Sequence, residues 1–379
     1  MIDLVNALQE QYREILIFSN KGGIFSEDIF RLYRPALLGN SFFITRGSVV
    51  NSIQNFPIVL RKLISTSLIV LEPIFLICNI ALFMVLLLKV KPTHILACNG
   101  GYPAAQACLA MVIAAWLIKI PVVLSICSMP SPRRVTLWLY DKFLDKLVWA
   151  GVNLIVTNAK AISEALLIQR EALPNKLKII YNGLDDVSTF QAPKIDRDEF
   201  IIGCVARMDV SKGVFYLLDA FSILVRMNPN MRLVLVGHGN ASEQLAKQIK
   251  FLGLENKVEL AGHYNGDINA LLSTFNVFVF PSLWEGFPYS IIEALRSGCV
   301  IVSTDVGGIP EAITDRVEGL LINPRSRDDI VSALQELISN QKLCNTLSKN
   351  ARKKFESKLT LSKMHNNVRK IFAELGKVN

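Results

Sequence analysis

The stretch NVFVFPSLWEGFPYSIIE, residues 276–293, decides how the chain is expected to fold. Residues 277–280 are β-branched or aromatic, which is typical of a strand buried on both faces of a parallel sheet. Pro281 ends this run, and turn-forming residues continue to Pro288. Apolar residues then recur at helical spacing. The pattern predicts a strand, a loop and the start of a helix.

Two acidic residues flank the predicted helix start, Glu285 in the loop and Glu293 about one turn into the helix. The first turn of a helix has unpaired backbone N–H groups and about half a positive charge, so it can hold a phosphate. Seven residues separate the two acids, and both can point into one crevice beside that phosphate. On spacing alone, the alternative is that Glu285 is a solvated loop acid and Glu293 a surface acid of the helix.

Strands and helices alternate throughout the second half, which predicts an α/β domain with a parallel sheet. The first strand ends in the loop RMDVSKG, so Arg207 and Lys212 lie five residues apart at the carboxyl end of a strand. There they could clamp a diphosphate, and the alternative is a surface-exposed pair. The strands are expected at residues 200–206, 232–236, 258–260, 277–280 and 300–303.

The first half shows the same alternation. One strand leads into the loop NGGYP, residues 99–103, at the sheet edge where open α/β sheets bind ligands. A tight turn before a helix at residues 104–117 is the alternative. The strands are expected at residues 14–19, 93–98, 121–127, 153–157 and 178–181.

Two domains are expected from these patterns and from a length of 379 residues, which is long for one core. The first is a Rossmann-like domain, residues 1–186, and the second covers residues 199–355. The polar segment 187–198 between them is the expected linker. Residues 356–379 are expected to form a C-terminal helix that packs back on the first domain.

Composition limits the classes of partner. The net charge is +9, with +6 in residues 1–198 and +3 in the remainder, so an anionic partner is expected. Lys and Arg form no long run and do not alternate with aromatic residues, so nucleic acid is not expected, and an anionic membrane surface or a phosphorylated substrate fits better. Seven scattered cysteines without a CxxC pair indicate core thiols in a reducing compartment, and with only four histidines no metal site is expected.

Residues 63–90 form the most hydrophobic part of the chain. A membrane span is one interpretation, but Glu72 and Pro73 interrupt the stretch, and the uncharged run is shorter than the ~20 residues that a span needs. Basic residues flank both ends, which is also typical of a helix lying in the membrane surface. We therefore favour a buried or membrane-surface helix.

Four motifs follow one another in the second half: VARMDVSKG, LVLVGHG, VFPSLWEGFPYSIIEAL and STDVGGIPEAI. Together they resemble the retaining glycosyltransferases of family four, whose third motif carries a Glu-x7-Glu pair. The resemblance covers about residues 200–330 and is looser in the first half. It implies the GT-B fold, in which two Rossmann-like parallel-sheet domains face each other across a cleft.

The resemblance implies a role for each matching residue. Arg207 and Lys212 would neutralise the diphosphate of a UDP- or GDP-linked sugar donor, with no metal and no further cofactor. Glu293 would bind the ribose, and Glu285 would be the catalytic residue beside the donor sugar. The backbone that would hold the sugar and its β-phosphate with Glu285 belongs to Gly286, Phe287, Pro288 and Tyr289.

The first half departs from the family pattern in two ways. Many family members carry a His where Cys127 or Ser128 stands here, so a His-assisted role is in doubt. Residues 5–19 also resemble the family's first helix and second strand, in which case the first strand and its glycine loop would lie upstream of Met1. In the alternative alignment, residues 14–19 are the first strand and NKGG, residues 20–23, is the glycine loop.

The expected function is transfer of a hexose, with retention of anomeric configuration, to a lipid-linked or saccharide acceptor. Such an enzyme would build a surface polysaccharide, lipopolysaccharide or glycolipid in the cytoplasm, with peripheral contact to the inner face of the membrane. A nucleotide-sugar epimerase of the same fold is one alternative. A nucleotide-sugar-binding protein with weak or no activity is the other.

Overall fold

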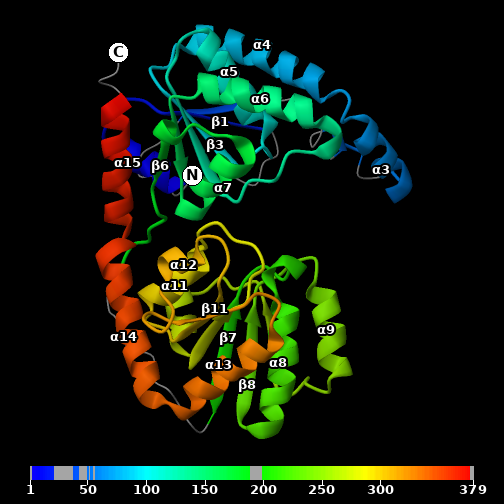
Figure 1. The fold of residues 1–379 in the computed structure, drawn as a ribbon, viewed down its shortest axis with the longest axis vertical. Helices are drawn as coiled ribbons and strands as arrows, with labels where there is room; N and C mark the ends of the chain where they lie inside the picture. The colour runs from blue at the N-terminus through cyan, green and yellow to red at the C-terminus, as the bar shows by residue number, and fades with distance from the viewer. Residues whose placement is uncertain are drawn as a thin grey trace. The chain divides into compact units, whose positions relative to one another are not determined.

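The computed structural model describes residues 2–20, 37–41, 49–50, 52–53, 56–187 and 199–375. The chain forms two compact units (Figure 1). The first comprises Met1–Asn158, Ile162–Ile180 and His365–Asn379, and the second comprises Ala159–Ala161 and Tyr181–Met364. All paired strands in the described part of the chain are parallel, as the alternating pattern predicts.

The first unit contains two separate parallel sheets among its described residues. The larger has the order β3-β4-β5-β6, and the smaller consists of β1 and β2. Its strands are β1 (Leu16–Asn20), β2 (Leu37–Ser41), β3 (Ile95–Gly101), β4 (Val122–Ser128), β5 (Leu154–Thr157) and β6 (Leu177–Ile179). Its helices are α1 (Ile2–Leu8), α3 (Ile58–Ser67), α4 (Glu72–Val90), α5 (Gln106–Leu117), α6 (Trp138–Gly151), α7 (Lys160–Arg170) and most of α15 (Leu361–Leu375).

Strand β3 extends further than expected. Asn99 pairs with Ile126 and Gly101 with Ser128, so the first residues of the NGGYP motif continue the strand. The expected loop therefore begins only at Tyr102, because pairing with β4 holds the preceding glycines in extended conformation.

The hydrophobic segment folds into two helices. Helix α3 ends at Ser67 and α4 begins at Glu72, and α4 packs along α5 (Figure 1). The buried residues of α4 recur every three or four positions, which is the spacing of one helix face. They are Glu72, Leu76, Asn79, Phe83 and Leu87.

The second unit is built on one six-stranded parallel sheet with the order β12-β11-β10-β7-β8-β9. Its strands are β7 (Phe200–Val205), β8 (Met231–Val236), β9 (Val258–Gly262), β10 (Val277–Phe280), β11 (Ile301–Thr304) and β12 (Leu320–Ile322). Its helices are α8 (Val214–Met227), α9 (Ser242–Phe251), α10 (Ile268–Ser273), α11 (Tyr289–Arg296), α12 (Ile309–Ala312), α13 (Arg327–Ser339) and α14 (Gln341–Lys358).

The core of the second unit confirms the strand expected at residues 277–280. Every residue of β10 is buried, and its neighbours β7 and β11 supply further buried apolar side chains. Helix α8 covers the sheet with Leu217, Phe221 and Leu224, which follow helical spacing. Burial of this kind stabilises by about 1.5–3 kcal/mol per large apolar side chain, so the core fixes the strand ends.

Several sequence predictions concern residues outside those that the structure describes. They include the glycines of NKGG and residues 188–198 of the expected linker.

The C-terminal helix α15 contacts the first residues of the chain. Arg369 of α15 donates to the carbonyl of Ala7, and Gln11 donates to the carbonyl of Arg369.

All seven cysteines are free thiols, but Cys78 and Cys127 are exposed, so these two are not the core residues we expected.

Candidate functional site

The strand order of the second unit creates a switch point between β7 and β10. Strands β8 and β9 lie on one side of β7, whereas β10, β11 and β12 lie on the other. Open parallel sheets bind ligands outside the carboxyl ends of their strands at such a point. The loop after β7 carries Arg207 and Lys212, and the loop after β10 carries Glu285. Topology therefore brings the predicted residues to one sheet edge.

Lys212 and Glu285 form a mostly buried ion pair at this edge. The distance from Lys212 Nζ to Glu285 Oε1 is 2.5 Å, and the two side chains are only 15% and 10% exposed. Ser282 Oγ donates to the same oxygen at 2.7 Å. Both donors meet Oε1, and no described contact uses Oε2. The carboxylate is thus oriented by two donors while one oxygen remains available to a ligand.

Two glycines allow the loops to approach closely. Gly213, which follows Lys212, has φ +66°, and a Cβ there would lie 1.9 Å from the carbonyl oxygen of Pro281. Gly307 has φ +56°, and its Cβ would lie 2.0 Å from the carbonyl oxygen of Glu285. Only glycine fits such positions without displacing the backbone. The loop around Glu285 is therefore held from both sides.

Arg207 lies apart from this ion pair. Its side chain is 75% exposed, and its guanidinium lies 3.2 Å from Asp209. The carboxylate of Asp209 also accepts from the backbone N–H of Asn240 at 3.3 Å. The structure thus places Arg207 on the same loop as Lys212, with Asp209 as a partner that the sequence analysis did not identify.

Glu293 lies on α11, half-buried, within the element predicted to hold it. Burial raises the pKa of its carboxyl, and the charge of Arg296 opposes that shift. Helix α11 begins after Pro288, and no side chain caps its first N–H groups. An uncapped helix start and a half-buried acid can receive an anion and a hydroxyl-bearing ligand respectively.

The remaining predicted backbone residues are held by neighbours that the sequence analysis did not assign. Phe287 is buried, its ring lies 5.0 Å from that of Tyr181, and its carbonyl accepts from Asn182 Nδ2 at 2.9 Å. Gly286 O accepts from the N–H of Gly308 at 2.8 Å. Pro288 and Tyr289 form the junction with α11, where Tyr289 is 38% exposed.

Glu311 is a further acid that the sequence analysis missed, although it lies within the STDVGGIPEAI motif. Its carboxylate accepts from the backbone N–H groups of Lys160 and Ala161, at 2.7 and 2.8 Å, all within the second unit. Burial, together with a hydrogen bond to Glu311, raises the pKa of Tyr181 to about 12. Glu311 thus fixes the position of Tyr181, which supports Phe287.

No group of three or more His, Cys, Asp or Glu residues in the described ranges is arranged to hold a metal ion. The chemistry that the described side chains can offer is electrostatic. Lys212 and the uncapped start of α11 supply positive charge, and Glu285 and Glu293 supply acceptors.

Residues 186–354 match the family model described as glycosyl transferases group 1. The chain is also 32% identical over 209 residues to a protein of Campylobacter jejuni, covering 54% of this chain and 56% of that protein. Its name is N-acetylgalactosamine-N,N'-diacetylbacillosaminyl-diphospho-undecaprenol 4-alpha-N-acetylgalactosaminyltransferase. A UDP-Gal:alpha-D-GlcNAc-diphosphoundecaprenol alpha-1,3-galactosyltransferase of Escherichia coli is 26% identical, with 69% of this chain and 72% of that protein covered. The chain spans between 56% and 60% of the length of three of its curated relatives.

Solved structures share the fold over nearly the whole chain. A glycosyltransferase from Rickettsia africae superimposes with a TM-score of 0.77 at 16% identity, covering 100% of this chain and 94% of that one. Anabaena Alr3699/HepE, solved with UDP and glucose, gives a TM-score of 0.72 at 20% identity, covering 98% and 95%. The predicted GT-B fold class is confirmed, and residues 186–354 are similar to the group 1 glycosyl transferases.

Proposed function

We propose that the chain is a retaining, metal-independent glycosyltransferase of family four. It moves a sugar from a UDP- or GDP-linked donor to an acceptor hydroxyl. The observation that carries this proposal is the buried pair of Lys212 and Glu285 at the switch point, directly ahead of α11.

Positive charge at this edge suits a diphosphate leaving group. Cleavage of the bond between sugar and diphosphate leaves negative charge on the β-phosphate, and preorganised cations or N–H groups stabilise that charge. Lys212 is held in place by Glu285, and the first N–H groups of α11 lack a side-chain cap. Arg207, with its exposed side chain on the same loop, can swing from Asp209 to the diphosphate when the donor binds.

The two acids contact different parts of the donor. Glu285 keeps Oε2 for a sugar hydroxyl or for the positive charge that develops at the anomeric carbon. Glu293, one turn into α11, accepts hydrogen bonds from the ribose. Burial, which raises the pKa of Glu293 in the free protein, is offset when ribose hydroxyls donate to its carboxylate.

The acceptor in this proposal is lipid-linked. Two relatives act, by their names, on sugars attached to diphospho-undecaprenol. The surface of the first unit supports a membrane-bound acceptor, because large apolar side chains of α3 and α4 are exposed. Basic residues lie among them on α3 and at the end of α4, namely Arg61, Lys62, Lys89 and Lys91. Exposed apolar residues with flanking basic residues favour an anionic lipid surface. The exposed set includes Ile58, Val59, Leu63, Ile74, Ile77, Val85 and Leu88.

Helix α4 is the one described helix that is long and apolar enough to cross a membrane, with mean hydropathy 2.4. Its start is tied to the protein, since buried Glu72 pairs with Arg134 at 2.6 Å. One face also packs on α5. We therefore propose that α4 lies in the membrane surface, at the cytoplasmic side where nucleotide-sugars are made.

The proposal is tested by incubating the purified chain with UDP- and GDP-sugars and vesicles that contain a polyprenyl-diphosphate sugar. Transfer of label into the lipid fraction, with the anomeric configuration of the product determined by NMR, supports it. Isomerisation of the donor without an acceptor would identify an epimerase. Binding without turnover of any donor would identify a binding protein.

A further inference from the structure

Helix α6 and the residues just before it expose a row of large apolar side chains. The short 3-10 helix η3 (Val135–Leu137) leads into α6. Val135, Leu139 and Phe143 are 94%, 76% and 62% exposed, and Trp138 is 45% exposed. These residues recur at three- and four-residue spacing, so they share one side of the helix. An exposed apolar row of this kind marks an interaction site.

Both acids of α6 are turned away from this row. Asp141 and Asp145 are buried. Asp141 accepts from the backbone and the side chain of Arg134, and Asp145 accepts from Tyr102 Oη at 2.7 Å. In α6, which the structure describes in full, the exposed residues are all apolar or basic. They are Trp138, Leu139, Lys142, Phe143, Lys146 and Ala150.

An exposed acid on the neighbouring segment leaves this face with positive charge. Glu171 lies 3.0 Å from Arg133 and 3.9 Å from Lys142. Because Arg133 makes the shorter contact, Glu171 does not cancel the charges of Lys142 and Lys146. The ammonium of Lys142 also lies 4.9 Å from the centre of the Trp138 ring. An indole beside a lysine is typical of the boundary between lipid headgroups and acyl chains.

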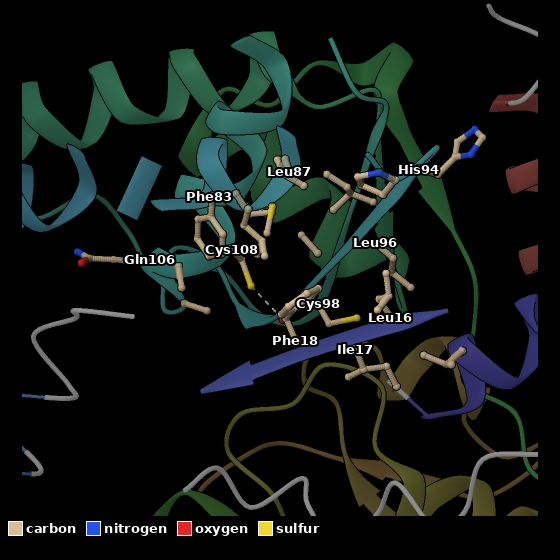
Figure 2. A pocket seen from close by; sticks show the side chains of 18 of the residues that line it. Leu16, Ile17, Phe18, Phe83, Leu87, His94, Leu96, Cys98, Gln106 and Cys108 are labelled. Atoms are coloured by element: carbon tan, nitrogen blue, oxygen red, sulfur yellow. Dashed lines mark hydrogen bonds between the residues drawn. The ribbon is translucent and has the colours of Figure 1, made fainter. Parts of the chain in front are cut away.

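Helix α4 exposes a second apolar face in the same unit. Figure 2 shows Phe83 and Leu87 of α4 among the side chains that line an internal pocket of about 1430 Å³. Val85 and Leu88 lie on the opposite side of the helix and are exposed. Helix α5 lies between α4 and α6 and contacts both (Figure 1). The two exposed apolar faces therefore belong to one layer of helices.

An ion pair joins the starts of these two faces. Arg134 immediately precedes η3, and it donates at 2.6 Å to buried Glu72, the first residue of α4. Exposed Val70 and Leu71 precede Glu72, and exposed Val135 follows Arg134. Apolar surface thus lies on both sides of the pair, which holds the start of α4 beside the start of α6.

The ion pair lies at the carboxyl edge of the larger sheet of the first unit. Strand β4 ends at Ser128, and the loop that follows it carries Arg134. Ser131 N donates to Tyr102 O at 2.9 Å, so this loop lies beside the loop that follows β3. Open parallel sheets bind their ligands outside this edge.

We propose that η3 and the first half of α6 form a second membrane contact, which joins α4 in one surface for anionic lipid. Trp138, Leu139 and Phe143 enter the boundary between headgroups and acyl chains, and Lys142 and Lys146 contact lipid phosphates. Two contacts fix the orientation of the first unit, with the carboxyl edge of its larger sheet toward the bilayer. The inference rests on the proposed function in one respect, since it gives a lipid-linked acceptor access to that edge.

A second copy of this chain is the alternative occupant of the face. A stable interface covers about 800 Å² on each partner, whereas this row is one helix wide. Two copies that met here across a two-fold axis would also bring Lys142 and Lys146 of one copy toward those of the other. Charge therefore favours an anionic lipid surface.

Sedimentation with vesicles, without donor or acceptor, tests the apolar row. Phe143→Ser is compared with Phe251→Ser, at an exposed apolar residue of the second unit. We expect Phe143→Ser to bind vesicles of phosphatidylcholine and phosphatidylglycerol at least fivefold more weakly, and Phe251→Ser to bind as the unchanged chain does. Because no sugar is present, a failure of this test is separate from a failure of the proposed transfer reaction.

A pair of lysine variants tests the charge. Lys142→Gln/Lys146→Gln is compared with Lys349→Gln/Lys353→Gln, which changes two exposed lysines at the same spacing on α14. Each lysine close to an anionic surface contributes about fivefold, so we expect the α6 variant to bind at least tenfold more weakly and its control to be unaffected. This pair keeps the proposal testable if Phe143→Ser does not fold, because it changes only exposed side chains.

Trp138 gives a direct readout of contact. Vesicles with brominated acyl chains quench an indole that enters the bilayer. We expect them to quench the tryptophan fluorescence of the unchanged chain, and expect Trp138→Phe to lose most of this quenching. Trp284→Phe, at an exposed tryptophan of the second unit, should retain it.

The proposal is overturned if the α6 variants bind vesicles as their controls do, or if Trp138→Phe is quenched as fully as the unchanged chain. It is also overturned if only α4 variants weaken binding. If Phe143→Ser instead dissociates a dimer that analytical ultracentrifugation detects without lipid, the face contacts a second copy and the proposal is wrong.

Discussion

Replacing Glu285 with Gln separates the chemical role of this carboxylate from its structural role. Gln keeps the shape and still accepts from Ser282 and Lys212, so the hydrogen bonds at 2.7 and 2.5 Å are retained, but the acceptor becomes neutral and Lys212 loses its counter-charge. A hydrogen bond to a charged group contributes roughly 1.5–3 kcal/mol and a neutral one roughly 0.5–1.5 kcal/mol. Because both partners are largely buried, solvent screens little of this difference. We expect the free energy of unfolding to fall by about 2–3 kcal/mol, because each of the two contacts loses about 1–1.5 kcal/mol.

Transfer should fall although most of the protein stays folded, because domains are typically stable by about 5–15 kcal/mol. Removing one preorganised electrostatic group from a reacting centre typically costs a factor of about 10²–10³ in kcat. The matched control is Glu243→Gln, which removes the same charge from an exposed pair with Lys247. An exposed pair contributes at most about 1 kcal/mol, so the control should be nearly silent in both assays.

The assays are urea unfolding and incorporation of labelled sugar into the lipid fraction. A Glu285→Gln protein that retains transfer within threefold of the Glu243→Gln control would refute the assigned role. Loss of transfer accompanied by unfolding would show that the carboxylate is chiefly structural.

Gly213→Ala should destabilise more than Gly253→Ala in thermal unfolding, because both have φ +66° but only Gly213 would place its Cβ against a backbone oxygen; equal losses would contradict this. Burial raises the pKa of Glu293 above the ordinary 4.5, so the folded chain holds this proton more tightly than the unfolded chain does. The folded chain therefore loses stability as pH rises from the pKa of the unfolded state to the higher pKa of the folded state. Glu293→Gln should therefore be more stable than wild type at pH 7 but not below pH ~4.5, while losing stabilisation by the donor; urea titrations at both pH values check this. Val85→Ser should weaken sedimentation with anionic vesicles, whereas Phe251→Ser, at an exposed apolar residue of the other unit, should not; equal effects would argue against an α4 membrane face.

Much of the second unit could be predicted from sequence, because its signals are local. Residues 277–280 form a buried strand, as the β-branched and aromatic run predicts. Tyr289 starts the helix, as the preceding proline and the helical spacing of apolar residues predict. Each of these signals acts within a few residues. The placement of Lys212 and Glu285 at one sheet edge was also accessible, because carboxyl ends of parallel strands share an edge.

What the sequence could not give was the pairing of side chains across loops. Lys212 contacts Glu285 across 73 residues, and Gly213 allows the loops that carry them to approach closely. Arg207 has the same charge, but its partner is Asp209 on its own loop, and the spacing of Arg207 and Lys212 did not reveal this difference. Glu311 was overlooked because its partners are backbone N–H groups, which no residue pattern marks.

The first unit was harder to predict for a different reason. The separation of β1 from β3 is a matter of long-range pairing, and a strand of five residues carries no mark of which neighbour it will have. Residues 63–90 were ambiguous because an apolar helix has the same composition in a core and at a membrane. The interruption at Glu72 and Pro73 was visible in the sequence, but the burial of Glu72 and its pairing with Arg134 were visible only in the structure.

The proposed function requires the loops after β7 and β10 and the start of α11 to bind a nucleotide-sugar. Hydrogen exchange of the chain with a panel of UDP- and GDP-sugars tests it most directly. We predict that at least one donor slows exchange in residues 206–213 and 281–296, and that Lys212→Met removes this effect. If no donor at millimolar concentration protects these two segments, or if protection falls only elsewhere, the claim is contradicted.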